Sequence, residues 1–224
     1  MLGTLVNAAT VAIGSSLGLT LGRNISESLR EKLLLAIGIF TVYLAFKMML
    51  MTERGVSLIL GLLLGTIIGH LLGLERRLEG AASKLNERMG GDSRFVDGIL
   101  VPFLTFCIGP MTLIGSLRDG MGDPSVILAK SVMDGFSSVA FASAFGVSVL
   151  LSAIPLLIFQ GSIALLGGLL GTSLPKDAIS DMTGAGGILL LALAIRILGI
   201  RRVEVSDMLP SLLVVPLISS LLQA

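Results

Sequence analysis

The sequence predicts an all-helical membrane protein, a polytopic bundle of about eight transmembrane helices, from its composition and from the lengths of its apolar segments. Of its 224 residues, 54% are hydrophobic and 14% are charged, and the mean hydropathy is +0.97. A water-soluble core of this size could not bury so many apolar residues, so the lipid bilayer is the expected surrounding. Eight apolar segments each approach the roughly 20 residues that a helix needs to cross the hydrocarbon layer. They are residues 3–22, 33–51, 55–74, 95–114, 125–145, 148–171, 181–199 and 206–223.

Basic residues gather in the loops that follow odd-numbered segments. Those loops carry Arg23, Arg30, Lys32, Arg76, Arg77, Lys84, Arg88, Arg94, Arg201 and Arg202, whereas the others carry Arg54, Arg118 and Lys176. Because basic loops stay in the cytoplasm, eight crossings place both termini outside it. The loop around Gly146 has no charge, so segments 125–145 and 148–171 could instead form one broken crossing. That alternative gives seven spans and a cytoplasmic C-terminus.

The first segment carries small residues four apart at Gly14, Gly18 and Gly22, a pattern that lets two helices approach closely. Asn7 lies near its start, where an interhelical hydrogen bond is a better interpretation than a ligand contact. Lys47, Arg196 and His70 fall near the ends of segments, where the cations can reach the headgroups and the histidine is expected at the interface.

The linker 75–94 places apolar residues at helical spacing, with charges on the opposite face. The apolar residues are Leu78, Ala82, Leu85 and Met89. This pattern predicts a short helix lying on the cytoplasmic surface. We expect Gly90-Gly91 to end it and Asp92 or Ser93 to cap the next helix.

A weak internal match relates residues 1–74 to residues 95–171 at a shift of 95 to 98 positions. At these shifts Gly14 falls on Gly109 and Lys32 on Lys130. Each unit would hold three crossings, so the second copy would be inverted, as in many secondary transporters. The chain is then a single transmembrane domain, residues 1–224, with two added helices at about 179–223 outside the repeat.

Residues 106–146 hold most of the side chains that are costly to place in a bilayer. A helix break is expected near Gly109-Pro110, followed by a glycine-rich turn and a helix entered at Pro124. Lys130 and Asp134, four residues apart, share one face of that helix, which Ser137 and Ser138 extend. Asp134 would lie about 15 Å below Pro124, near the middle of a layer about 30 Å thick. A carboxylate at that depth is usually functional.

These residues could support more than one chemistry. For a cation, the candidate oxygens are those of Thr112, Ser116, Asp119, Asp123, Asp134 and Ser137, with carbonyls freed at Gly109-Pro110. An anion would suit Lys130, Arg118 and the helix start at Pro124. Asp134 could also carry a proton. Gln160 or Ser138 would complete the site, and Asp119 and Asp123 would guard its outer mouth. The structural alternative is that Lys130 and Asp134 neutralise each other and hold two helices together.

The sequence gives little support to other classes of function. A net charge of +1, one Tyr and no Trp do not suit nucleic-acid binding. One His and one Cys do not suit zinc hydrolysis or cysteine–histidine catalysis, and no cofactor is expected. Gly120 to Asp123 match the Gly-x-Gly-Asp motif of intramembrane aspartyl proteases, but in a turn rather than within a helix. This enzyme is a remote alternative.

Two long stretches resemble a known family. The opening MLGTLVNAATVAIGSSLGLTLGR and the segment CIGPMTLIGSLRDGMGDPSVILAKSVMDGFSSVAFASAFG, with the following PLLIFQG, are similar to the prokaryotic membrane proteins catalogued as domain of unknown function 554. The resemblance covers almost the whole chain. It implies a small polytopic protein of a bacterial or archaeal plasma membrane, and it assigns no catalytic or binding residues.

The sequence therefore predicts a transporter or channel for a small ion or solute, with its site on the fifth helix. The alternative is a non-transporting membrane scaffold. The glycine-rich helix faces further predict a homo-oligomer, most simply a dimer.

Overall fold

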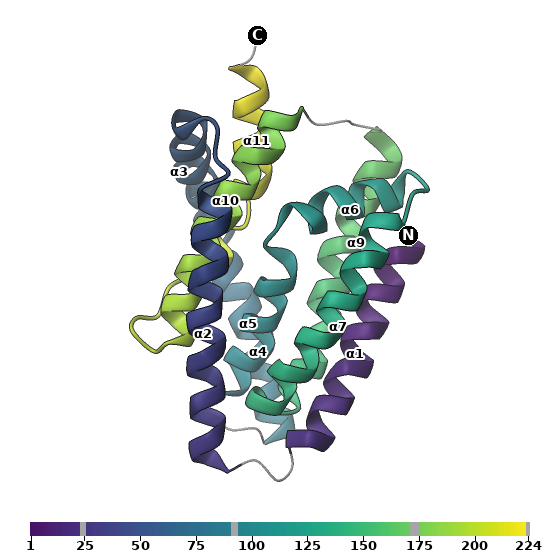
Figure 1. The fold of residues 1–224 in the computed structure, drawn as a ribbon, viewed down its shortest axis with the longest axis vertical. Helices are drawn as coiled ribbons and strands as arrows, with labels where there is room; N and C mark the ends of the chain where they lie inside the picture. The colour runs from purple at the N-terminus through teal and green to yellow at the C-terminus, as the bar shows by residue number, and fades with distance from the viewer. Residues whose placement is uncertain (23–25, 91–93, 171–174, 223–224) are drawn as a thin grey trace. The chain divides into compact units, whose positions relative to one another are not determined.

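The computed structural model describes residues 1–22, 26–90, 94–170 and 175–222, and every regular element in these ranges is a helix. The all-helical fold class is confirmed. The helices form two compact units (Figure 1), and each is described by itself. Unit 1 comprises Met1–Leu34, Glu79–Cys107 and Met111–Thr172, and unit 2 comprises Leu35–Leu78, Ile108–Pro110 and Ser173–Ala224.

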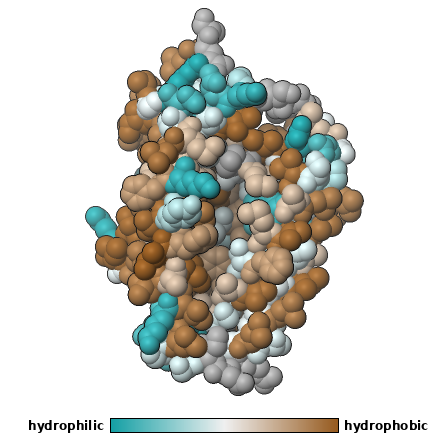
Figure 2. All heavy atoms as spheres, in the orientation of Figure 1, coloured by the Kyte–Doolittle hydropathy of each residue, from teal (hydrophilic) through white to brown (hydrophobic). Residues whose placement is uncertain are grey.

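Among the described residues, six helical segments are long and apolar enough to cross a membrane. They are α1 (Leu2–Gly22), α2 (Glu27–Met49), α3 (Gly55–Leu72), α7 (Ser125–Phe145), the segment Ser148–Gly168 and α10 (Lys176–Ile197). The segment Ser148–Gly168 joins α8 (Ser148–Leu151) to α9 (Ala153–Leu170). Apolar side chains cover much of the visible surface in Figure 2, as expected for lipid-facing helices. The chain is a multi-pass membrane protein.

The two remaining apolar segments differ from the simple crossings that hydropathy predicts. The first is α5 (Phe95–Cys107) followed by α6 (Pro110–Gly120), two helices bent by 72° that would count as a seventh span if taken together. The second consists of η1 (Val205–Met208) and α11 (Ser211–Leu221). Proline explains both interruptions because it lacks an N–H and clashes with the preceding turn: Pro110 follows the first break, and Pro210 lies between η1 and α11.

The chain reverses between α7 and α8 at Gly146, whose φ is +82°. Glycine adopts this left-handed conformation without steric cost, which makes it a common helix terminator. Ser125–Phe145 and Ser148–Gly168 are thus separate helical segments, each long and apolar enough to cross, and the number of crossings stays a prediction. The inverted repeat stays a prediction.

Unit 1 is organised around the close contact of α1 with α7, which lie side by side in Figure 1. A Cβ added at Gly14 would lie 2.2 Å from the Gly135 carbonyl oxygen, and one at Gly18 would lie 2.3 Å from the Val139 carbonyl oxygen. The predicted close approach is confirmed. Since ascending positions of α1 meet ascending positions of α7, the two helices run parallel.

The amphipathic helix predicted in the linker is α4 (Leu74–Met89). Its Ala82 and Leu85 pack against Phe95 and Ile99 of α5, within unit 1. Gly90, with φ of +62°, follows its last turn as expected. The predicted cap at Asp92 or Ser93, the second glycine at Gly91, the loop residue Arg23, and the predicted segment ends at Gly171 and Gln223 lie outside the described residues.

Unit 2 repeats the use of small residues in α3. A Cβ added at Gly65 would lie 2.3 Å from Ser211 Cα, and one at Gly61 would lie 2.5 Å from Val215 of α11. The order of these contacts makes α3 and α11 antiparallel. The glycine faces of α1 and α3 are therefore occupied within their own units, and they no longer argue for self-association.

Candidate functional site

The Lys130–Asp134 pair lies near the midpoint of α7, as predicted. Both side chains are buried, with relative exposures of 8% and 6%, and Lys130 Nζ donates directly to Asp134 Oδ2. Lys130 also lies over the Phe106 ring, 5.9 Å from its centroid, and Phe106 meets Phe141 edge to face. These rings keep the ion pair in surroundings of low polarity, where its electrostatic attraction is strong.

Two amides from other helices join the pair. Asn7 of α1 donates from Nδ2 to Asp134 Oδ2 at 3.0 Å and to Gln160 Oε1 of α9 at 3.1 Å. The close approach of α1 and α7 positions Asn7 for this contact. We call Asn7, Lys130, Asp134 and Gln160 the polar quartet. The interhelical hydrogen bond expected of Asn7 is confirmed, and it links α1 both to the predicted carboxylate and to Gln160.

The quartet leaves two polar atoms without a hydrogen-bond partner among the described residues: Asn7 Oδ1 and Gln160 Nε2. Both side chains are fully buried. The orientation of the Asn7 amide follows from its surroundings, because its NH₂ group faces two acceptors and a flip would set oxygen against oxygen. A buried polar atom left unpaired costs about 1–3 kcal/mol, so each atom would be stabilised by a polar guest.

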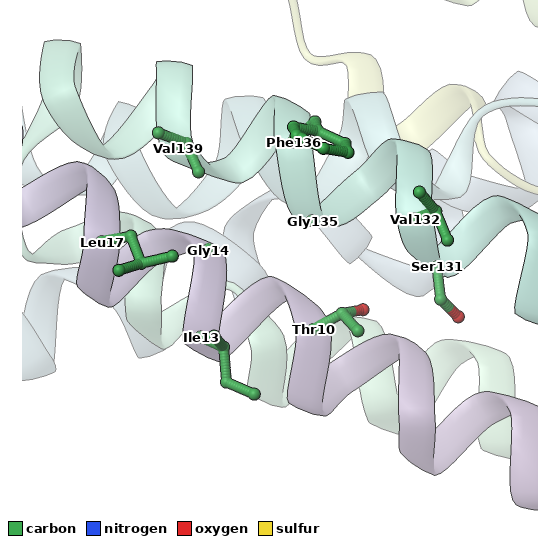
Figure 3. Close-up of a pocket in the computed structure, with 9 residues that line it drawn as sticks. All are labelled: Thr10, Ile13, Gly14, Leu17, Ser131, Val132, Gly135, Phe136 and Val139. Atoms are coloured by element: carbon green, nitrogen blue, oxygen red, sulfur yellow. The ribbon is translucent and has the colours of Figure 1, made fainter.

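An open groove of about 290 Å³ follows the contact between α1 and α7 (Figure 3). Its walls are apolar, with Ile13 and Phe136 among them, and its lining includes the hydroxyls of Thr10 and Ser131. Each of these two residues lies about one helical turn from a quartet member, Thr10 from Asn7 and Ser131 from Asp134. The lining of the groove thus comes within one helical turn of the quartet on both helices, although no quartet residue lines it.

The hydroxyls predicted near the ion pair have different places. Ser138 is buried beside Gly14 and donates to the Gly135 carbonyl. Ser137 does not extend the buried face: it is exposed, because the face that meets α1 continues through Ser138 instead. Thr112 is buried and donates to the Phe106 carbonyl at 2.7 Å.

The helix break predicted at Gly109-Pro110 is found, since α5 ends at Cys107 and α6 begins at Pro110. One carbonyl freed there, that of Phe106, is the acceptor of the Thr112 hydroxyl. This hydrogen bond holds the end of α5 beside Lys130, whose charge suits the negative end of a helix.

Asp119 lies at the start of α1, and its place at an outer mouth stays a prediction. It is almost fully buried, and its two carboxylate oxygens accept hydrogen bonds from Gly3 N at 3.0 Å, Thr4 N at 2.8 Å and Thr4 Oγ1 at 2.8 Å. Gly3 N and Thr4 N are backbone donors that the first turn of a helix leaves unpaired. Asp119 therefore caps α1 from α6, across more than a hundred residues of sequence.

Asp123 lies in the turn between α6 and α7 and is exposed. Hydrogen bonds from the Ser125 hydroxyl and backbone N–H lower the pKa of the Asp123 carboxyl. Asp123 Oδ2 also forms an ion pair with Arg118 Nη1 at 3.7 Å. The arrangement is that of a solvated turn at the start of α7.

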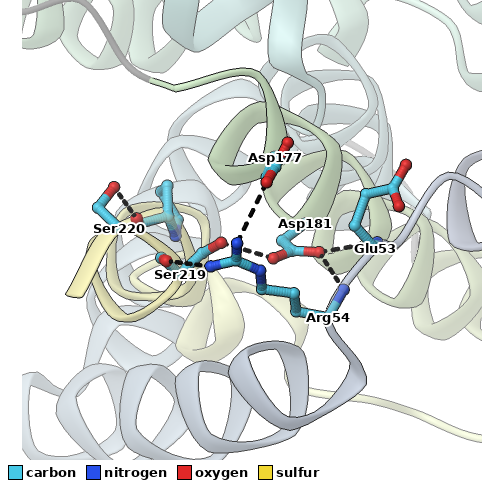
Figure 4. A network of polar contacts seen from close by, with 7 residues as sticks. Glu53, Arg54, Asp177, Asp181, Ser219 and Ser220 are labelled. Carbon is cyan, nitrogen blue, oxygen red and sulfur yellow. Dashed lines mark hydrogen bonds and ion pairs between the residues drawn. The ribbon is translucent and has the colours of Figure 1, made fainter. Parts of the chain in front are cut away.

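A second polar network, in unit 2, was not predicted. Asp181 of α10 is fully buried and accepts from Glu53 N at 2.9 Å, Arg54 N at 2.8 Å and Ser219 Oγ at 2.6 Å (Figure 4). Arg54 also contacts Asp177 at 3.2 Å. Asp181 thus caps the start of α3 as Asp119 caps α1. The carboxylate oxygens of Asp181 already accept hydrogen bonds, which makes this network structural.

Arg196 differs from its predicted place at the headgroups. Its side chain is buried, and Nη1 donates to Glu75 Oε1 at 2.5 Å. Glu75, at the start of α4, is buried as well. A paired carboxylate compensates the buried charge, so Arg196 has no need to reach solvent.

Comparison with known proteins places this chain in one family. A family model described as Protein of unknown function (DUF554) matches residues 2–220. The chain is 30% identical over 220 residues to the uncharacterized protein YqgA of Escherichia coli (strain K12), covering 95% of this chain and 94% of that protein. It is 28% identical over 229 residues to the uncharacterized membrane protein YdfK of Bacillus subtilis (strain 168), covering 100% of this chain and 98% of that protein. No solved structure matches it.

Proposed function

This chain belongs to the family described as Protein of unknown function (DUF554), and we propose that it is a transporter or channel that carries a small ion or polar solute through unit 1. The observation that supports this proposal is the polar quartet, a group of four buried polar side chains from α1, α7 and α9 that meet near the midpoint of α7. Ionisable groups at that depth are costly and usually mark a solute or ion pathway. Since both named relatives come from bacteria, the proposed location is the plasma membrane of a prokaryote.

Each member of the quartet has a role in this proposal. Asp134 is the ligand or coupling carboxylate, and Lys130 balances its charge. Asn7 offers a free acceptor and Gln160 a free amide donor. The break between α5 and α6 lies beside Lys130, in keeping with transporter sites formed at interrupted helices.

Flux measurements in proteoliposomes test the proposal. Asp134→Asn removes the charge while nearly keeping the shape, so we expect folded protein and flux reduced to the level of empty vesicles across a panel of ions and small solutes. Asp177→Asn is the matched control, because it makes the same change at a half-exposed carboxylate of unit 2. If Asp134→Asn transports as well as the wild-type protein, Asp134 has no part in the mechanism.

A non-transporting scaffold is the second candidate. It is favoured by one observation: the quartet ties α1, α7 and α9 together and would stabilise unit 1 with no solute at all. Replacing both Lys130 and Asp134 by Leu distinguishes the two functions. A scaffold should keep or gain stability, since an apolar pair of similar size often replaces a buried ion pair without loss, and any cellular phenotype should persist. A transporter should lose flux.

Proteolysis stays a remote alternative that gains no support from the carboxylates. An aspartyl protease needs two carboxylates that share a proton. Asp123 is exposed beside Arg118, whereas Asp134 is buried against Lys130, so each has its own cation. The homodimer stays a proposal without support from the glycine faces of α1 and α3, which are occupied within their own units, and the mass of cross-linked protein would test it.

A further inference from the structure

Three side chains that can bind metal meet in unit 2, away from the polar quartet. His70 lies in the last turn of α3, Glu204 directly before η1, and Asp207 within η1. Each offers one ligand atom, and the three atoms lie within 4.8 Å of one another. His70 Nδ1 is 3.5 Å from Asp207 Oδ2. The fold therefore gathers one imidazole and two carboxylates from segments more than a hundred residues apart in sequence.

A hydrogen bond from the Glu75 backbone holds the Asp207 carboxylate in place. Its Oδ1 accepts from Glu75 N at 2.8 Å, which leaves Oδ2 directed at His70. Glu75 is itself fixed, because its Oε2 accepts from Ser206 N at 2.8 Å and its Oε1 from Arg196. Metal ligands are commonly oriented by such outer hydrogen bonds, which reduce the reorganisation that binding requires.

We propose that His70, Glu204 and Asp207 bind a divalent metal ion of the zinc or cobalt kind. One nitrogen and two oxygens suit a borderline ion better than Mg²⁺ or Ca²⁺, which prefer oxygen ligands alone. Ligands about 2.1 Å from a tetrahedral zinc ion lie about 3.4 Å apart, close to the observed 3.5 Å between Nδ1 and Oδ2. Glu204 is exposed and closes the remaining distance by rotating its side chain.

The charges around His70, Glu204 and Asp207 also suit a divalent cation. The charge of Glu75 is matched by Arg196, so Glu204 and Asp207 remain to neutralise two positive charges. Arg201 and Arg202, earlier in the same loop, oppose a cation and make the site weaker than a closed structural one. His70 and Glu204 are exposed, so water completes the coordination shell. The site is thus open to exchange with the surrounding solution.

Direct titration with Co²⁺ and Zn²⁺ tests the proposal on purified full-length protein without a polyhistidine tag. We expect one Co²⁺ per chain, with visible absorption bands that Zn²⁺ displaces. His70→Ala and Glu204→Gln should each weaken binding at least about tenfold, since even the loss of an outer hydrogen bond to a ligand costs roughly 10–100-fold. Glu53→Gln is the matched control, because it neutralises an exposed glutamate of unit 2 outside the cluster.

Each result decides for or against the site. Stoichiometric binding that is weakened by His70→Ala and Glu204→Gln but unchanged in Glu53→Gln supports it. Absence of stoichiometric binding to the wild-type protein overturns it, as does equal affinity of the His70→Ala protein. Thermal unfolding of each variant in the absence of metal shows whether it is folded. Asp207→Asn is left out because Asp207 also accepts the Glu75 N–H. The readout is binding, so the result is independent of transport.

Discussion

Gly14→Ala should destabilise unit 1 because it places a methyl group where the backbones of α1 and α7 approach closely. The added Cβ would lie 2.2 Å from the Gly135 carbonyl oxygen and 2.2 Å from Ser138 Oγ. The Ser138 hydroxyl can rotate away, but the Gly135 carbonyl belongs to the α7 backbone. The helices must then move apart by about 1 Å, a gap that forfeits a quarter to a half of the dispersion energy of the contacts it opens.

The size of the effect follows from the cost of overpacking. Methyl groups forced into a close-packed interior cost about 1–3 kcal/mol. For a chain of this length each kcal/mol lowers the unfolding temperature by about 2–4 °C, so we expect a decrease of about 2–12 °C. Gly161→Ala in α9 is the matched control: its Cβ would meet only Met1 Cε, at 3.9 Å. Alanine favours a helix over glycine by roughly 0.5–1 kcal/mol at both positions, and this gain cancels in the comparison.

The single cysteine provides the assay. Cys107 is fully buried, so a maleimide dye that fluoresces on reaction with a thiol reports unfolding as the protein is heated in detergent. The absence of tryptophan from the sequence makes intrinsic fluorescence a poor alternative. If Gly14→Ala melts at or above the temperature of Gly161→Ala, the close contact of α1 with α7 is wrong. Separation of these helices should also lengthen the Asn7–Asp134 hydrogen bond of 3.0 Å, so the same variant should lose flux.

Two further predictions concern the carboxylates around α6. Asp119→Asn should destabilise the protein by about 1–3 kcal/mol in the same assay. The amide of the introduced asparagine would turn an NH₂ group toward the donors of Gly3 and Thr4, so at least one donor would lose its acceptor. An unchanged melting temperature would mean that Asp119 does not cap α1. Asp123 should stabilise the folded protein slightly at pH values above the ordinary carboxyl pKa, because Ser125 donates hydrogen bonds to the charged form. This stabilisation should be lost as the pH falls through the lowered pKa of Asp123. The difference in unfolding temperature between wild-type protein and Asp123→Asn should therefore stay constant near neutral pH and shrink as the pH falls below the ordinary carboxyl pKa. A difference that grows on acidification would contradict the assignment.

The sequence predicts best what depends on local rules. The break at Gly109-Pro110 follows from proline stereochemistry, and the importance of Lys130 and Asp134 follows from the rarity of charges in apolar segments. The stripe of Gly14 and Gly18 predicts close packing for a similar reason, since small residues matter in a membrane helix mainly where backbones meet.

The partners of these residues could not be predicted, because they come from distant segments. Asn7 reaches Asp134 across 127 positions, and helical periodicity defines a face without saying which helix will cover it. The same limit explains Ser137, which helical spacing places almost as close to Asp134 as Ser138, although α1 covers the side of Ser138.

The contacts of charged residues near the ends of apolar segments could not be predicted, for a related reason. Position alone suggests that Arg196 reaches the headgroups, and nothing local indicates that Glu75 is buried beside it. Asp181 likewise marks the start of a segment in the sequence, whereas in the structure it caps α3. Hydropathy also counts residues 206–223 as one crossing because it averages over Pro210, the point at which η1 and α11 separate.

The polar quartet is the centre of this account, and an experimental density map of the protein in lipid nanodiscs would test it most directly. We expect ordered non-protein density, a water or a bound ion, within about 2.7–3.2 Å of Asn7 Oδ1 or Gln160 Nε2. A dry site, in which both atoms bond to protein groups and no density lies beside Asp134, would contradict a solute pathway through unit 1 and favour the scaffold.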